Sequence, residues 1–102
     1  MGGREMKIKA YIKRPDELIG HSTWIENSLK NLQNTVDGYI EAVTVDNFVI
    51  ICNEEGRLKD LPYNCTICDL DFFGTIIFAG IDGDEFGDCP ITFEEYKKLI
   101  QG

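Results

Sequence analysis

Hydrophobic and polar residues alternate near the start of the chain. Ile8, Ala10 and Ile12 alternate with lysines, which is the period of a strand with one buried face, and Pro15 ends the pattern. Residues 1–5 precede this pattern as an N-terminal extension, either native or a remnant of expression. We therefore predict a single domain over residues 6–102 that opens with a strand.

A helix is expected next. Thr23 and Glu26 have the spacing of a capping box, the arrangement that often starts a helix. Apolar residues then recur at helical intervals, at Ile25, Leu29, Leu32 and Val36. The pattern predicts a helix that ends before Asp37 and Gly38.

The middle of the chain predicts a hairpin. Two runs rich in β-branched residues, 39–45 and 48–52, flank Asp46 and Asn47, a pair that suits a tight turn. The second run is apolar at every position, so we expect it to lie centrally in a sheet. Residues 65–73 carry no clear signal.

The last third of the chain predicts a buried strand over 75–81, a loop over 82–88 and a short helix. A second capping box is formed by Thr92 and Glu95. Apolar residues follow it at helical spacing, at Phe93, Tyr96, Leu99 and Ile100.

These elements together favour a small α+β domain. We expect a mainly antiparallel sheet of about four strands with two short helices. A chain of 102 residues buries a modest core, so the pattern is also compatible with a homodimer formed through an edge strand or an apolar patch.

Charge narrows the classes of function. Eighteen acidic residues against ten basic ones give a net charge of −8, and residues 60–102 alone contribute −7. Direct binding to nucleic acid phosphates rests on clustered lysines and arginines, so it is disfavoured. No apolar run is long enough to cross a membrane and no secretory signal is evident, so we expect a cytoplasmic protein.

The acidic block has two interpretations. The simpler and favoured one is a solvated loop face. The sharper one is an electronegative surface that meets a basic partner or imitates the charge of DNA. The candidate partner-binding residues are the acids Asp69, Asp71, Asp82, Asp84, Glu85 and Asp88, with Phe86 or Trp24 as an apolar anchor. For Trp24, a place at the edge of the core is favoured over an exposed one.

Four cysteines are more than a chain of this length usually carries. Cys65 and Cys68 have the C-x-x-C spacing of half a zinc site or of a redox pair. Cys52 lies within an apolar strand, Cys89 stands alone, and the single histidine, His21, is distant in sequence. Reduced thiols that behave as small hydrophobic residues, with Cys52 buried, are the favoured interpretation.

No catalytic motif is recognisable. The segment from Asp82 to Asp88 is similar to a calcium loop, but Phe86 and Phe93 occupy positions that an EF-hand reserves for oxygen ligands. No phosphate-binding glycine motif is present, and no pair of carboxylates stands out for acid–base chemistry. We expect no cofactor and no enzymatic activity.

One resemblance covers nearly everything from Met6 onwards. It rests on four segments: 38–43 (GYIEAV), 51–64 (ICNEEGRLKDLPYN), 74–80 (GTIIFAG) and the closing 92–100. In these the chain resembles a family of small domains of unknown function found in Firmicutes, their phages and their mobile elements. The asparagine–glutamate–glutamate–glycine turn followed by leucine–proline–x–asparagine is the most specific part.

The resemblance implies a setting in mobile DNA, where small acidic proteins often block host defences. Our first hypothesis is therefore a non-enzymatic inhibitor of a nucleic-acid-targeting defence system, anti-CRISPR or anti-restriction, that acts by protein–protein binding or by mimicking DNA charge. The alternative is a small zinc- or metal-binding regulatory module that uses Cys65 and Cys68. A weaker third hypothesis is a hydrolase that uses the acidic loop with a divalent ion.

Overall fold

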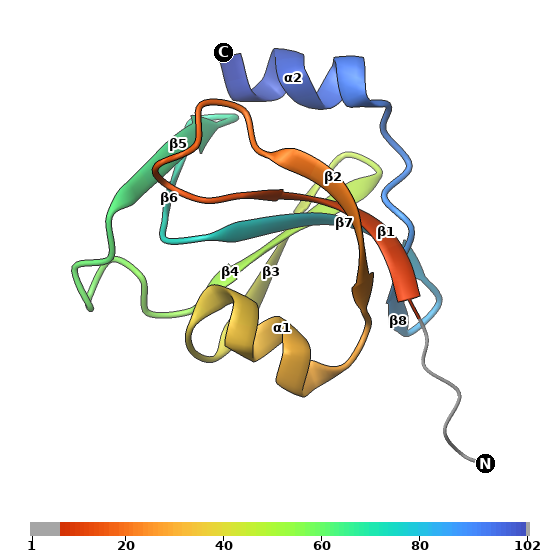
Figure 1. Cartoon of the computed structure of the whole chain (residues 1–102), viewed down its shortest axis with the longest axis horizontal. Coiled ribbons are helices and arrows are strands. Elements are labelled where there is room, and N and C mark those ends of the chain that lie inside the picture. The colour runs from red at the N-terminus through yellow and green to blue at the C-terminus, as the bar shows by residue number, and fades with distance from the viewer. Residues whose placement is uncertain (1–6, 102) are drawn as a thin grey trace.

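A computed structural model describes residues 7–101, which form eight strands and two helices (Figure 1). The strands are β1 (Lys7–Lys13), β2 (His21–Glu26), β3 (Ile40–Val45), β4 (Phe48–Asn53), β5 (Tyr63–Ile67), β6 (Leu70–Phe73), β7 (Ile76–Asp82) and β8 (Glu85–Gly87). The helices are α1 (Leu29–Val36) and α2 (Phe93–Gln101). The extension expected at residues 1–5 lies outside the described residues.

Six strands form one antiparallel sheet. Its order is β2-β1-β7-β4-β3, and the short β8 pairs with the end of β7. β4 and β7 lie inside the sheet, and Ile50, Ile51 and Ile77 are fully buried there because both faces of the sheet are covered. β5 and β6 form a separate two-stranded sheet.

Each face of the main sheet has its own apolar core. On one face, α1 covers a cluster that includes Leu32, Val36 and Ile51. On the other face, α2 and the β5–β6 hairpin cover a cluster built around Phe72, Phe78 and Tyr96. Figure 1 shows α1 and α2 on opposite sides of the sheet. The fold is therefore a central sheet between two unequal layers.

The predicted helix from Thr23 onwards is wrong in its first half. Residues 21–26 form β2, and all six pair with β1. Thr23, Trp24 and Ile25 are β-branched or aromatic residues, which favour a strand over a helix. The helix begins only after Ser28, whose side chain accepts a hydrogen bond from the Asn31 amide at 3.2 Å.

The expectation of about four strands is also too low. The unassigned stretch 65–73 forms most of the β5–β6 hairpin, and the predicted loop 82–88 contains the turn and the second strand of the β7–β8 hairpin. The small antiparallel domain with two helices is confirmed, as are the β3–β4 hairpin and the capping box before α2. In that box the Thr92 amide donates to the Glu95 carboxylate at 2.8 Å, and the Glu95 amide donates to the Thr92 hydroxyl at 3.1 Å.

Candidate functional site

The acidic residues singled out by the sequence lie on two separate hairpins. Asp69 and Asp71 belong to the β5–β6 hairpin, whereas Asp82, Asp84 and Glu85 belong to the β7–β8 hairpin. Figure 1 shows the first of these hairpins at the left of the molecule and the second at the right. The structure therefore does not gather these acids into one face, and each hairpin has to be considered by itself.

The β7–β8 hairpin borders a groove beside α1, which we call the α1 groove. Its volume is about 340 Å³, and its lining residues are Asn27, Leu29, Leu32, Ile40, Asp84, Glu85 and Phe86. Four of these residues are apolar, and the hairpin supplies the carboxylates of Asp84 and Glu85. Leu29, the first residue of α1, is 59% exposed here. Ile81, on the β7 strand of the hairpin, is 56% exposed. Three of the residues predicted for partner binding thus meet at one groove.

The β7–β8 hairpin is held to the sheet by its flanks and not by its acidic tip. The Asn27 amide donates to the Phe86 carbonyl at 2.9 Å, and the Asp88 carboxylate accepts a hydrogen bond from the Lys9 backbone at 2.8 Å. A side chain at Gly80 would overlap the carbonyl oxygen of Asp88, so glycine permits this close approach. Asp88 therefore has a structural role.

The tip itself carries free charge. Among residues 7–101, no ion pair or side-chain hydrogen bond engages the carboxylates of Asp82, Asp84 or Glu85. Gly83, with a φ of 65°, allows the tight turn between β7 and β8. Three carboxylates are thus displayed within four residues and stay available to a partner.

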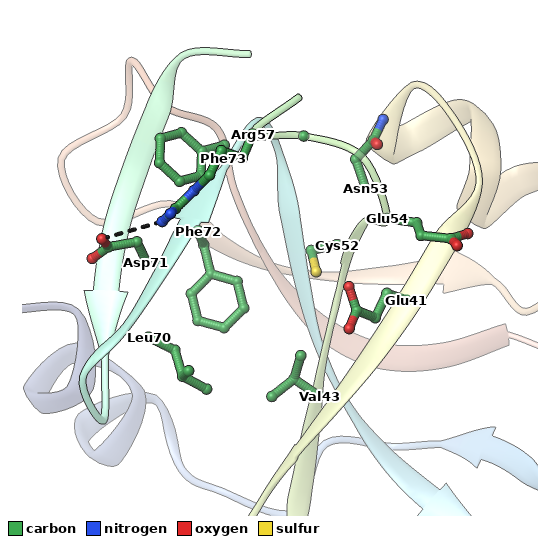
Figure 2. A pocket seen from close by; sticks show the side chains of 11 residues that line it. Glu41, Val43, Cys52, Asn53, Glu54, Arg57, Leu70, Asp71, Phe72 and Phe73 are labelled. Atoms are coloured by element: carbon green, nitrogen blue, oxygen red, sulfur yellow. Dashed lines mark ion pairs between the residues drawn. The ribbon is translucent and has the colours of Figure 1, made fainter. Parts of the chain in front are cut away.

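A second groove lies between the β3–β4 hairpin and β6, and we call it the β6 groove (Figure 2). Its volume is about 220 Å³, which is below the ~300–1,000 Å³ of typical small-molecule sites. It is lined by Glu41, Val43, Cys52, Asn53, Glu54, Gly56, Arg57, Leu70, Asp71, Phe72 and Phe73. Its size suits a single side chain of a partner better than a free ligand.

Asp71, one of the predicted residues, is engaged on the wall of the β6 groove. Its carboxylate lies 3.5 Å from the Arg57 guanidinium and accepts a hydrogen bond from Thr66 at 2.6 Å. The guanidinium also lies over the ring of Phe73, 5.1 Å from its centre. Figure 2 shows Arg57 reaching between Phe73 and Asp71. This acid is therefore partly neutralised within the protein.

Glu41 and Glu54 are groove residues that the sequence argument missed. Both are exposed, and neither has an ion-pair partner within residues 7–101. Glu41 lies opposite Cys52 in the β3–β4 ladder. The predicted hairpin about Asp46 and Asn47 already implied this pairing, so the register of the hairpin was the signal that could have located Glu41.

The two asparagines in the most specific part of the sequence pattern tie neighbouring segments of the fold together. The Asn53 side chain donates to the carbonyls of Val36 and Asp37, at 3.1 and 2.9 Å, and accepts from the Glu55 amide at 2.7 Å. Asn64 donates to the carbonyls of Lys13 and Gly74, each at 2.8 Å.

Asn64 also provides a hydrogen-bond partner for a buried amine. Its carbonyl oxygen accepts a hydrogen bond at 2.9 Å from the Lys13 amine, whose residue is only 4% exposed. An unsatisfied buried amine would be costly, so this bond ties β5 to β1. The two asparagines of the pattern are therefore structural residues.

The four cysteines are placed as isolated thiols. Cys52, Cys65 and Cys89 are buried and Cys68 is exposed at the β5–β6 turn. Burial, with a smaller contribution from Glu41, raises the pKa of Cys52 to about 11, and burial also raises the pKa of Cys65 and of Cys89. These three thiols stay protonated at neutral pH.

No metal-binding group emerges from residues 7–101. No three residues of the types histidine, cysteine, aspartate and glutamate come together there in a geometry that could hold an ion. The side chains of Cys65 and Cys68 differ in environment, one in the core and one in solvent. His21 lies 3.5 Å from the Glu17 carboxylate at the exposed end of β2.

The sequence favours a place at the edge of the core for Trp24, and that prediction is wrong. It lies in the edge strand β2 opposite Lys9 and is 61% exposed. Its neighbour Ile25 faces the core on the α1 side because successive strand residues point to opposite faces. Trp24 contributes to neither groove.

The comparisons with known proteins give a family and no function. A family model described as "Domain of unknown function (DUF3846)" matches residues 6–101. The chain belongs to the DUF3846 family. No curated protein and no solved structure matches this DUF3846 domain. In the described part of the chain neither helix has the length and hydrophobicity needed to span a bilayer.

Proposed function

We propose that this DUF3846 domain is a binding protein without catalytic activity that docks on a basic surface of another protein. The observation that carries the proposal is the free acidic tip of the β7–β8 hairpin beside the α1 groove. Asp82, Asp84 and Glu85 supply charge, and Leu29 and Ile81 supply exposed apolar area. Interfaces commonly combine an apolar centre with a charged rim.

The absence of a catalytic role is part of this proposal. The buried thiols are held protonated, so they are poor nucleophiles. Tyr96 donates its hydroxyl proton to the Ile19 carbonyl, and burial raises its pKa, so it is a poor proton donor or acceptor at neutral pH. The three buried thiols and Tyr96 thus serve packing, and Asn53 and Asn64 serve hydrogen bonding within the fold.

A narrower form of the proposal concerns the partner. In that form the partner is a nucleic-acid-binding effector of a host defence system, and the domain acts as an anti-CRISPR or anti-restriction inhibitor. Such effectors hold nucleic acid in basic channels, which an acidic tip of this kind complements. The net charge of −8 supports this form, and identification of the captured partner tests it.

The experiment is a capture of partners from the native host with the purified domain as bait, followed by mass spectrometry and by measurement of the affinity of the captured partner. The test variant is the triple change Asp82→Asn, Asp84→Asn, Glu85→Gln. We expect it to weaken binding about tenfold at low salt, because steering by clustered charge contributes about 10- to 1,000-fold to association.

A matched control removes three charges elsewhere. Asp16, Asp37 and Asp60 are exposed and line neither the α1 groove nor the β6 groove. Asp37 and Asp60 have positive φ angles, which asparagine also adopts readily. If the triple Asp→Asn variant at these sites loses as much affinity as the hairpin variant, net charge and not the hairpin governs binding, and the proposal is wrong.

A further inference from the structure

The edge strand β3 offers unpaired backbone groups to solvent. The Glu54 amide donates to the Tyr39 carbonyl at 2.8 Å, which makes this a hydrogen-bonded pair at the start of the β3–β4 ladder. Hydrogen-bonded and non-hydrogen-bonded pairs alternate along an antiparallel ladder. It follows that Glu41, Val43 and Val45 direct their backbone groups toward β4. Ile40, Ala42 and Thr44 direct theirs away from the sheet.

This edge has little of the usual protection against another strand, since Glu41 is its one charged side chain. Proteins commonly block edge strands with charged side chains, above all lysine, or with proline, a bulge or a covering segment. β3 pairs with β4 over six residues without a register shift, and its sequence, isoleucine–glutamate–alanine–valine–threonine–valine, contains neither lysine nor proline. No other strand of residues 7–101 pairs with its outer edge. The strand is therefore open to addition of a further strand.

The β6 groove lies on one face of this edge and gives it a chemical preference. Glu41 and Val43 of β3 line the groove, as do Glu54 after β4 and Leu70 on β6. A residue opposite Glu41 on an added strand would have its Cβ about 5 Å away, on the same face. A long basic side chain there would meet the Glu41 carboxylate and could extend along the apolar floor formed by Val43 and Phe72.

We propose that β3 binds an extended segment of another protein as an added strand, with a lysine or arginine of that segment opposite Glu41 and directed into the β6 groove. The charge of the groove argues for this occupant, since Glu41 and Glu54 are exposed and unpaired among the described residues. The cationic side chain of the groove, Arg57, is paired with Asp71. A second copy of the chain is disfavoured because it brings another net charge of −8 to an acidic edge.

The β6 groove shares no lining residue with the α1 groove, although Ile40 of β3 lines the α1 groove, so protection at Ala42 and Thr44 distinguishes the two surfaces. The test does not involve the β7–β8 hairpin. The probes are synthetic eight-residue peptides that alternate threonine and valine and carry lysine, arginine, norleucine or glutamate at the fourth position. Binding is followed by the hydrogen exchange of individual backbone amides at millimolar peptide. We expect slower exchange at Ile40, Ala42 and Thr44, and binding about two- to fivefold tighter for lysine or arginine than for norleucine.

Variants separate the backbone from the side-chain contribution. Ala42→Pro removes an outward amide and should abolish binding, whereas Ala42→Ser keeps the amide and should bind as the unchanged chain does. Glu41→Gln should remove the preference for lysine over norleucine. Thr44→Lys is a second blocking variant, and circular dichroism checks that each variant is folded.

Three results would overturn the proposal. The first is that no peptide slows exchange at the outward amides of β3. The second is equal binding of the lysine and glutamate peptides. The third is protection of the same amides by self-association, seen as a concentration-dependent dimer in sedimentation, which would make the occupant a second copy.

Discussion

The two acidic hairpins differ in what their charges and side chains do within the fold. The β5–β6 hairpin covers one core, and its Asp71 is bound by Arg57 and Thr66. The β7–β8 hairpin is anchored through Asn27 and Asp88, and its tip keeps three carboxylates free. Similar stretches of acidic sequence thus serve a structural role in one place and provide a candidate docking surface in the other.

The strongest test of this difference removes one phenylalanine from each hairpin. Phe72 is 4% exposed within the core, so Phe72→Ala should lower the free energy of unfolding by about 3–5 kcal/mol. Phe86 is half-buried, so Phe86→Ala should cost roughly 1–2 kcal/mol. Urea denaturation measures both values. Equal losses would mean that the two hairpins contribute equally to the stability of the fold.

The asparagine anchors give a second comparison. Asn64→Ala leaves the buried Lys13 amine without its side-chain partner and should cost about 3 kcal/mol. Asn27→Ala loses one part-buried bond to Phe86 and should cost about 1 kcal/mol. Thermal and urea unfolding of the two variants give the values, and a cost at Asn64 no greater than that at Asn27 contradicts the structural role of Asn64.

Alkaline pH should lower the free energy of unfolding through Cys52, which is buried under the β5–β6 side of the sheet. Burial raises the pKa of Cys52 from 9.0 to about 11, so between these pH values the unfolded chain loses the thiol proton before the folded protein does. Stability attributable to this thiol is therefore complete below pH 9 and falls as pH rises toward 11, by on the order of 2 kcal/mol. Between pH 9 and pH 11 the free energy of unfolding of the Cys52→Ala variant should decline less than that of the unchanged chain. Urea denaturation at several pH values measures this decline.

The smallest expected effects concern single charges. Asp71→Asn weakens an exposed ion pair with Arg57 and should cost no more than about 1 kcal/mol. Asp84→Asn removes one of three crowded like charges and should leave stability unchanged or raise it slightly. Differential scanning calorimetry at low salt compares them. A larger cost at Asp84 would show that the β7–β8 tip is engaged within the fold.

Local patterns in the sequence predicted much of the fold. The alternation about Ile8 and Ala10, the Asp46–Asn47 turn and the capping box at Thr92 each depend on neighbouring residues, and each is confirmed. The apolar spacing from Ile25 to Leu29 misled because it crosses the boundary between β2 and α1. Ile25 is buried by the sheet, whereas Leu29 is exposed.

The β5–β6 hairpin and the two acidic sites were harder to predict. The β5–β6 turn places Cys68 and Asp69 at φ angles of 52° and 67° without glycine, so it gives little signal in the sequence. The acids of residues 60–102 are close in sequence, but β7 carries the chain across the sheet between the two hairpins. Only the tertiary arrangement shows that they form two groups and that Glu41 joins one of them.

Hydrogen exchange of the domain bound to its captured partner is the most direct test of docking through the β7–β8 hairpin. We expect slower exchange of backbone amides in residues 81–86 and near Leu29, with the β5–β6 turn at Cys68 and Asp69 unchanged. Protection confined to the β5–β6 hairpin, with residues 81–86 exchanging as in the free protein, would contradict it.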